Sequence, residues 1–292
     1  MNDYTNAIEV KDLTKRYDGF TLDNLSFNVP GGSIMGFIGQ NGAGKTTTIN
    51  TILNIVKPDS GTVKVFGLDH IRDEKEIKKH IAAVFDELPF DDRLTASDIN
   101  VIMREIYDQW DSDKFFAFLD RFQLPKKKKF GKFSKGMKMK MQIAAALSHN
   151  AKLLIMDEAT TGLDPVVRNE ILDIFFEFLQ DEEHSILMSS HITSDLEKIA
   201  DSVTFIDKGK LLISGCKDDI LESHAILRCS RADYEAIDKS DIVSARINDF
   251  SIDVMVSDAD GCRRRYPGII TDKANLDDIM LFYVNRDKKE WR

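Results

Sequence analysis

Residues 39–47 read GQNGAGKTT, a run whose residue types and spacing suit a loop that binds phosphate groups. Three glycines let the backbone curl so that its N–H groups point inward at phosphate oxygens. Lys45 can reach the β- and γ-phosphates of a nucleotide, and the Thr46 hydroxyl can bind Mg²⁺. A buried strand is predicted before the run and a helix after it, as the motif requires. The residues expected to hold nucleotide are Gly39, Asn41, Gly42, Gly44, Lys45, Thr46 and Thr47.

A second run, LLIMDE at 153–158, places two acidic residues directly after four apolar ones. The pattern predicts a buried strand that delivers Asp157 to the Mg²⁺ ion, usually through water. Glu158, one residue further on, is placed to polarise the attacking water as a general base. Taken alone this pattern is weak, because any buried strand that ends at a surface turn could show it. Behind a phosphate loop, it predicts the second half of a nucleotide-hydrolysing site.

The elements that must position these residues alternate between strand and helix. Nearly continuous apolar runs predict buried strands at 33–39, 152–158 and 185–191. Amphipathic or apolar-rich runs predict helices at 45–55, 135–149 and 165–180, the last with Pro165 at its first position. This alternation predicts an α/β fold with a mainly parallel sheet.

Other segments complete the outline. Alternating apolar and polar residues at 7–30 predict two strands, and 202–215 predicts a hairpin. Residues 74–82 are predicted to be helical and 84–87 to be a loop, and helical spacing at 95–124 predicts a helical insertion. Past Gly215 short weak strands and a final helix near 276–284 predict a small α+β appendage.

Composition and charge limit the class of protein. With 42% hydrophobic and 30% charged residues, the chain is typical of a globular protein. A formal charge of −9 argues against a nucleic-acid partner, since phosphate backbones require a positive surface. No window is long and apolar enough to cross a bilayer, and the polar, acidic N-terminus is unlike a secretory signal. Three scattered cysteines suit free thiols in a reducing compartment, so we expect a cytoplasmic location.

Four motifs together resemble a known family. They are residues 39–47, KFSKGMKMKMQIAAAL at 132–147, LLIMDEATTGLDP at 153–165 and MSSH at 188–191. Their order and spacing are similar to those of an ABC-type ATPase cassette, over roughly residues 7–215. The resemblance implies a P-loop NTPase core, ATP as the nucleotide, an antiparallel β subdomain and a helical subdomain at about 87–145. Residues 216–292 are then a small accessory domain.

The second of these motifs is the family's signature, and it departs from the usual LSGGQ. This chain reads FSKGM at 133–137, a variant that looks like the SKGMK form of some bacterial exporter subunits. Ser134 and Gly136 keep the hydroxyl and the glycine N–H that can hold a γ-phosphate. The family implies a head-to-tail dimer, with a second copy or a different ATPase subunit, in which this signature faces the partner's phosphate loop.

The resemblance also implies roles for four further residues. Asp164 belongs to the segment that crosses the dimer interface, and His191 resembles the switch histidine that contacts the γ-phosphate and positions Glu158. Tyr17 resembles the aromatic residue that stacks on adenine. Asp86, with Glu87 beside it, stands where the family normally has a glutamine that touches Mg²⁺. Aspartate is a suitable Mg²⁺ ligand but has a shorter reach, so its contact with the ion stays open.

The resemblance implies the ATP-hydrolysing subunit of a membrane exporter, bound peripherally to its membrane-spanning partner. The SKGMK form resembles exporters of peptides or antimicrobial compounds. A soluble ABC ATPase acting on ribosomes or DNA is the main alternative; such proteins carry a second cassette or a long coiled coil, which this chain lacks. A small-molecule kinase would leave FSKGMK and His191 unexplained. The sequence does not favour one role for residues 216–292 among dimer contact, regulation and packing.

Overall fold

The computed structural model describes residues 5–86, 90–288 and 290–291. At its centre lies a six-stranded sheet with the strand order β10-β9-β3-β8-β7-β6. All of its pairings are parallel except that of β9 with β10. Strands β3, β7 and β8 are buried along their whole length, as strands covered on both faces must be. The strands span β3 Ile34–Ile38, β6 Ile81–Phe85, β7 Leu153–Asp157, β8 Ser185–Ser190, β9 Ser202–Asp207 and β10 Lys210–Cys216.

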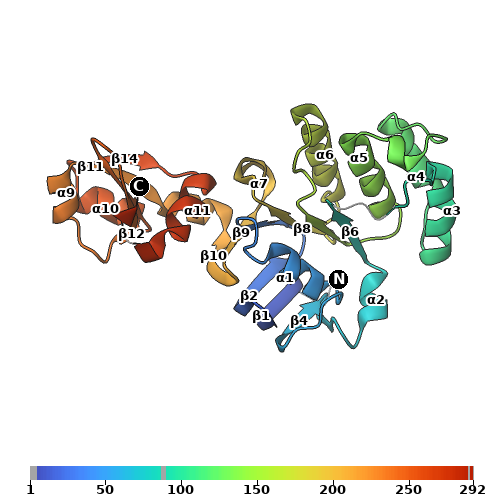
Figure 1. The fold of residues 1–292 in the computed structure, drawn as a ribbon, viewed down its shortest axis with the longest axis horizontal. Helices are drawn as coiled ribbons and strands as arrows, with labels where there is room; N and C mark the ends of the chain where they lie inside the picture. The colour runs from blue at the N-terminus through green and yellow to red at the C-terminus, as the bar shows by residue number, and fades with distance from the viewer. Residues whose placement is uncertain (1–4, 87–89, 289, 292) are drawn as a thin grey trace.

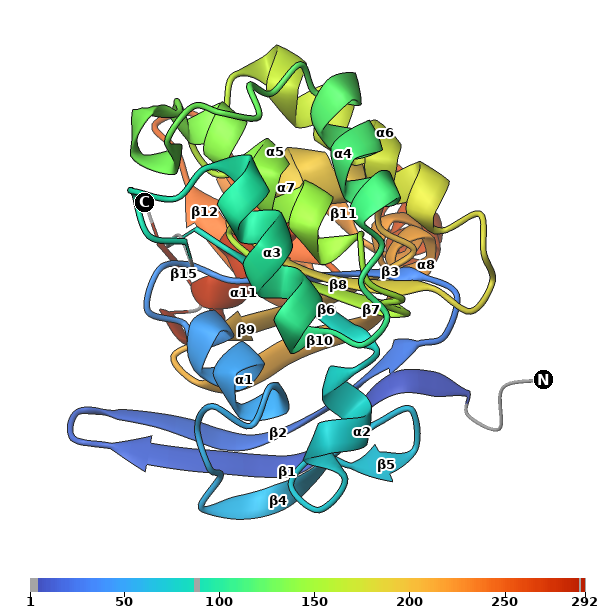
Figure 2. The same cartoon turned by 90° about the vertical axis from the view of Figure 1, so that its right-hand side faces the viewer.

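A second, antiparallel sheet packs under the first. Its strand order is β2-β1-β4-β5, and helix α1 lies between the two sheets (Figure 2). Apolar side chains from both sheets and from α1 form one buried cluster, which fixes the helix against the end of β3. The elements span β1 Asn6–Tyr17, β2 Phe20–Pro30, α1 Lys45–Ile52, β4 Ser60–Val65 and β5 Leu68–Asp69.

Helices cover the opposite face of the central sheet (Figure 2). Their starts follow from local sequence: Thr95 and Asp98 form a reciprocal capping box before α3, and Asp111 caps α4. The helical insertion lies at one end of the molecule (Figure 1). The helices on this face span α3 Ala96–Ile106, α4 Ser112–Arg121, η1 Phe130–Lys132, α5 Lys135–Ala146, α6 Pro165–Phe178 and α7 Thr193–Ile199. Helix α2, Glu74–Lys78, lies on the other side, where Ile77 joins the cluster between the two sheets.

The C-terminal residues build a third sheet at the other end of the long axis (Figure 1). Its order is β14-β11-β13-β12-β15. Helices α9 and α10 join the buried cluster on one face, whereas α11 packs with Ile226 and Met255 of the other face and joins the main core. The elements span α8 Lys217–Ser223, β11 Ala225–Cys229, α9 Arg231–Ala236, β12 Ile242–Ile247, β13 Ile252–Val256, α10 Ala259–Arg265, β14 Ile270–Lys273, α11 Leu276–Val284, η2 Arg286–Lys288 and β15 Glu290–Trp291.

The architecture confirms the predicted fold class, including the mainly parallel sheet, the antiparallel subdomain and the helical insertion. One local prediction was wrong. The helix expected over 74–82 ends at Lys78, and part of the loop expected at 84–87 is strand: Ile81–Phe85 form β6, paired in parallel with β7. A short apolar run fits either helix or strand, and here pairing with β7 decides. No helix of the described residues is long and apolar enough to span a membrane.

Candidate functional site

The phosphate loop connects β3 to the first turn of α1. Gly44 precedes the helix at φ 112°, and a Cβ there would lie 2.5 Å from the Leu22 side chain. Gly42 has a φ of 80°, and no atom would lie within 4 Å of a Cβ placed on it. Ala43 O accepts a 2.9 Å hydrogen bond from Gly209 N at the turn between β9 and β10. Glycine is therefore required at Gly44 by both conformation and space, and the first-turn N–H groups of α1 remain available to an anion.

Lys45 occupies the centre of this loop. Its Nζ donates to Gly39 O at 2.6 Å and to Gln40 O at 3.3 Å, and it lies 2.8 Å from Glu158 Oε1. The side chain is only 5% exposed, so its charge is held away from water by oxygen acceptors. Phosphate oxygens are acceptors of the same kind, and an ammonium group can exchange one set for the other. The loop and its lysine thus fit a triphosphate.

Asp157 is held by two hydroxyl groups. Thr46 Oγ1 donates to Oδ2 at 2.6 Å, and Ser189 Oγ donates to Oδ1 at 2.5 Å. The carboxylate sits at the end of β7 and is 6% exposed. A carboxylate and a hydroxyl brought together at one point are the hard oxygen ligands that Mg²⁺ prefers. The residues therefore fit the ion, and Ser189, which the sequence reasoning did not single out, orients them from β8.

Glu158 follows the strand in an unusual backbone conformation, at φ 54°. This left-handed geometry is rare outside glycine, and such strain clusters at functional sites. The turn directs the side chain to three partners: Lys45, His191 Nδ1 at 2.6 Å from Oε2, and Thr161 Oγ1, which donates to Oε2 at 2.8 Å. Burial opposes ionisation, but these partners outweigh it and lower the pKa of Glu158 below its usual value. The carboxylate stays charged and can accept a proton.

Comparisons with known proteins agree with this geometry. The family model described as ABC transporter matches residues 22–161. The bacitracin transport ATP-binding protein of Bacillus licheniformis is 40% identical over 209 residues, which are 70% of this chain and 68% of that protein. The chain belongs to the ABC transporter ATP-binding proteins. As a member it binds nucleotide, hydrolyses ATP and serves transport.

Two further relatives extend the comparison for this ABC subunit. The lantibiotic transport ATP-binding protein of Streptococcus pyogenes is 33% identical over 70% of this chain and 89% of its own length. A solved structure described as the ATP-binding subunit of an ABC transporter superposes with a TM-score of 0.68. It is 28% identical and covers 74% of this chain and 92% of that one. The fold and the family are therefore shown by both sequence and structure.

The signature motif of this ABC subunit lies at the start of α5. Ser134 caps α5, its Oγ accepting from Met137 N at 3.3 Å, and is exposed. Asp164 caps α6 by accepting from the N–H groups of Val166 and Val167. Among the hydrogen bonds of residues 5–86, 90–288 and 290–291, none joins Ser134, Gly136 or Asp164 to residues 39–47. Their predicted roles toward nucleotide stay predictions.

Asp86 follows β6 beside the candidate metal residues. Its backbone N donates to Asp157 O at 3.2 Å, but its carboxylate lies 2.6 Å from Lys135 Nζ, with both side chains nearly half exposed. The two departures from the usual family pattern, in the glutamine position and in the signature, thus contact each other. The metal role predicted for Asp86 stays a prediction, and Glu87 lies outside the described residues.

Tyr17 lies at the end of β1 and is 45% exposed. Its ring is 5.6 Å from Lys15 Nζ, and its cross-strand partner is Phe20. The Phe20 ring is 2.9 Å from where a Cβ on Gly44 would be, so Phe20 packs against the phosphate loop. The adenine-stacking role predicted for Tyr17 stays a prediction, and Phe20 was not singled out from the sequence.

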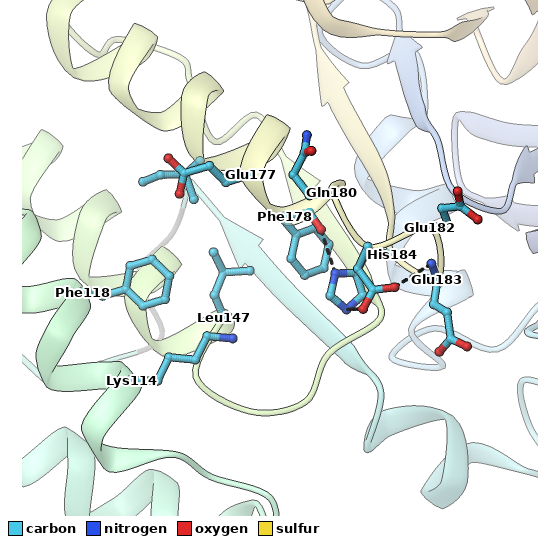
Figure 3. Close-up of a pocket in the computed structure, with 11 residues that line it drawn as sticks. Lys114, Phe118, Leu147, Glu177, Phe178, Gln180, Glu182, Glu183 and His184 are labelled. Atoms are coloured by element: carbon cyan, nitrogen blue, oxygen red, sulfur yellow. Dashed lines mark hydrogen bonds and ion pairs between the residues drawn. The ribbon is translucent and has the colours of Figure 1, made fainter.

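A hollow of about 800 Å³ lies elsewhere, between α4, α6 and the turn before β8 (Figure 3). Two of its acidic residues have partners: Glu177 pairs with Arg121, and Glu183 pairs with Lys152. His184 Nδ1 contacts Phe178 O at 2.7 Å. None of the residues that line the hollow is one of the predicted nucleotide-site residues.

Proposed function

We propose that this subunit hydrolyses Mg-ATP at a site shared between two ATPase subunits and thereby powers a membrane exporter. The observation that carries the proposal is a continuous network that runs from Thr46 through Asp157 and Ser189 to Glu158. Glu158 in turn contacts Lys45 and His191. That network joins the residue types needed to bind a triphosphate, hold a metal and activate water. The names of the relatives, bacitracin and lantibiotic transport proteins, support peptides or antimicrobial compounds as cargo.

Different residues of the chain carry out different parts of the proposed reaction. Lys45 and the N–H groups of the loop bind phosphate oxygens. Thr46 and Asp157 would hold Mg²⁺, and the ion would neutralise phosphate charge. Glu158 accepts the proton of the attacking water, and His191 and Thr161 fix its carboxylate. In the structure Lys45 is paired with Glu158, so binding of a triphosphate draws the lysine to phosphate and leaves the carboxylate free for water.

A second subunit is part of the proposal because, among the described residues, no hydrogen bond joins the signature to the phosphate loop of the same chain. Ser134 and Gly136 lie at the exposed start of α5, where a helix N-terminus can bind the phosphate of a facing nucleotide. A head-to-tail pair, of two copies or of one copy with a related subunit, brings this start onto the partner's phosphate loop. Closing such a pair with ATP and opening it by hydrolysis converts nucleotide state into motion.

A groove of about 1,000 Å³ is suited to the membrane partner. It runs between α3 and the core, and exposed apolar side chains line it, among them Ile55, Ile102 and Ile106. Its lining also includes Phe85, the last residue of β6, whose carbonyl accepts from Gln142 at 3.2 Å. Because Asp86 follows Phe85, a partner segment seated here would contact the strand that ends at the nucleotide site. We place the subunit on the cytoplasmic face through this contact.

Light scattering tests the shared site. Glu158→Gln keeps the loop and the metal residues but removes the base, so with Mg-ATP it is expected to collect as a dimer. The control is the double variant Lys45→Ala/Glu158→Gln, which is expected to stay monomeric because nucleotide is not retained. A Glu158→Gln variant that remains monomeric at saturating Mg-ATP would contradict the shared site.

Co-purification tests the membrane partner. The subunit is co-expressed with a candidate membrane-spanning partner, and Ile106→Lys is compared with Phe250→Lys. Both residues are exposed, at 63% and 100%, but only Ile106 lines the groove. Ile106→Lys is expected to lose the membrane protein and Phe250→Lys to retain it. Equal retention by both variants would place the partner elsewhere.

A further inference from the structure

Helix α11 of the C-terminal unit is joined to α7 at two points. Thr193 Oγ1, on the first residue of α7, donates to Asp277 Oδ1 at 2.6 Å. Leu276 N, at the first residue of α11, donates to Glu197 Oε2 at 3.2 Å. Thr193 and Glu197 are four residues apart and therefore share one face of α7. The start of α11 is thus fixed along one full turn of α7.

Apolar packing supports these bonds. Leu196 and Ile199 of α7 and Leu276 and Ile279 of α11 belong to the same buried cluster. The side of the C-terminal unit that faces the core is formed by α11 (Figure 1). Thr193 is 2% exposed, so its hydroxyl depends on Asp277 for a partner. The contact holds two parts of the chain together and is not a loose surface bond.

The turn that carries His191 directly precedes α7. Ser190 Oγ accepts from Ile192 N at 2.9 Å, and His191 lies between these two residues. Only Ile192 separates His191 from Thr193. The imidazole contacts Glu158 Oε2 through Nδ1 at 2.6 Å. A chain of contacts therefore runs from Asp277 through Thr193 and the turn to the side chain proposed as the base.

We propose that Asp277 is a positioning residue for hydrolysis, which acts through Thr193 on His191. The C-terminal unit would then be part of the catalytic apparatus and not a separate accessory domain. The inference rests on the proposed function, because it uses the roles given there to Glu158 and His191. Loss of the Asp277 contact is expected to lower the rate of hydrolysis only in part, because α7 has a second anchor. Asp195 of α7 lies 3.6 Å from Arg168, which donates to Leu163 O.

Steady-state ATP hydrolysis by the full chain tests the proposal. Asp277→Ala is expected to lower kcat about 3- to 10-fold, the effect of one hydrogen bond, with the KM for ATP changed less than about 2-fold. Asp277→Asn keeps an oxygen acceptor and is expected to recover most of the rate. Thr193→Val removes the same bond from its other side and is expected to match Asp277→Ala.

Asp278→Ala is the matched control. Asp278 lies in the same turn and forms the capping box of α11 with Asn275, but makes no hydrogen bond to α7 in the described residues. Its loss weakens the cap of α11 while leaving the link to α7 intact, so kcat should stay within about 2-fold of wild type. An equal loss of kcat in Asp278→Ala and Asp277→Ala would show general loosening and overturn the proposal.

A double-mutant cycle separates positioning from structural damage. If Asp277 acts through the imidazole, Asp277→Ala should add no loss in a His191→Ala background. Additive losses would overturn the inference while leaving the proposed function intact. A wild-type chain without ATPase activity, or an unimpaired His191→Ala variant, would instead contradict the proposed function first. If Asp277→Ala fails to fold, the same cycle is run with Thr193→Val.

Discussion

Two lysine–carboxylate pairs stand near the nucleotide site and differ mainly in burial. Lys45 and Glu158 lie 2.8 Å apart with side chains 5% and 18% exposed. Lys135 and Asp86 lie 2.6 Å apart with side chains 47% and 46% exposed. The first pair is surrounded by the phosphate loop and the strand ends, whereas the second bridges the start of α5 and the end of β6 in contact with water.

The comparison shows that distance alone does not measure the strength of an ion pair. An exposed pair is worth about 0.2–1 kcal/mol, because water screens the charges and two long side chains must be ordered. Removing one partner of a buried pair leaves an uncompensated charge and costs about 3–5 kcal/mol when burial is complete. The buried pair between Lys45 and Glu158 is therefore costly to break unless another anion takes the place of the carboxylate, and in the proposed mechanism that anion is phosphate. The exposed pair between Lys135 and Asp86 can break readily.

The largest expected effect is that of Glu158→Gln on turnover. Loss of the general base should lower kcat for ATP by about 10²–10⁴-fold, because glutamine cannot accept the proton of water. The rate of phosphate release measures it, with Glu177→Gln, in the surface pair with Arg121, as the control that stays active. Unchanged turnover in Glu158→Gln would remove Glu158 from the mechanism.

Lys45→Ala should weaken nucleotide binding by about 100-fold or more. The variant removes two or more charge-assisted hydrogen bonds to phosphate, each worth about 1.5–3 kcal/mol. Titration with a fluorescent ATP analogue gives the Kd. Lys135→Ala, from the exposed pair, should change the Kd of the isolated subunit little. Similar losses in both variants would mean that burial does not distinguish the pairs.

His149 shows what burial alone does to the pKa of a side chain, because no ion pair joins it to a carboxylate among the described residues. It is 4% exposed and stacks on Tyr107, and burial lowers its pKa to about 4. The unfolded chain takes up this proton near pH 6.5 and the folded chain near 4. The free energy of unfolding should therefore fall by about 2–3 kcal/mol as pH drops across that window.

Denaturant titrations at several pH values measure the slope, which is how steeply the free energy of unfolding changes with pH. His149→Phe keeps an aromatic ring on Tyr107 but cannot bind a proton, so the difference between the two proteins isolates the histidine. The variant should lose most of the slope between pH 6.5 and 4. A slope that is the same in both proteins would contradict the lowered pKa.

The smallest expected effect on stability is that of Asp86→Asn. Breaking the pair with Lys135 should change the free energy of unfolding by less than about 1 kcal/mol. If Asp86 also serves the metal, the Mg²⁺ concentration for half-maximal hydrolysis should rise, while Lys135→Ala leaves it nearly unchanged. A Mg²⁺ curve for Asp86→Asn that coincides with wild type would remove the metal role from this residue.

Local sequence signals predicted most elements of the fold. The buried strands, the helix after the loop and the final helix at 276–284 all follow from periodicity, caps and turn residues. β6 was missed because IAAVF is apolar throughout and has no period that separates strand from helix. The sheet at β11–β15 was seen only as weak strands, since long-range antiparallel pairing with mixed burial leaves little local pattern.

The nucleotide-site residues were also predicted unevenly. Glycine, lysine and threonine at fixed spacing form a recognisable phosphate-loop motif, so each residue of the loop could be given a predicted role from the sequence. Ser189 and Thr161 could not, because a serine on a buried strand or a threonine in a turn is usually structural. Their roles depend on distances across strands, which only folding sets.

The sequence by itself indicated the family, the phosphate loop and the two acids at the end of β7, Asp157 and Glu158, because those features are local and need particular residue types. The tertiary structure decided which groups meet: Asp86 with Lys135, Ser189 with Asp157 and Asp277 with Thr193. These contacts join residues 32 to 84 positions apart, or bridge separate elements, so no window of sequence contains them. Their geometry comes from sheet order and helix packing, which the whole chain determines together.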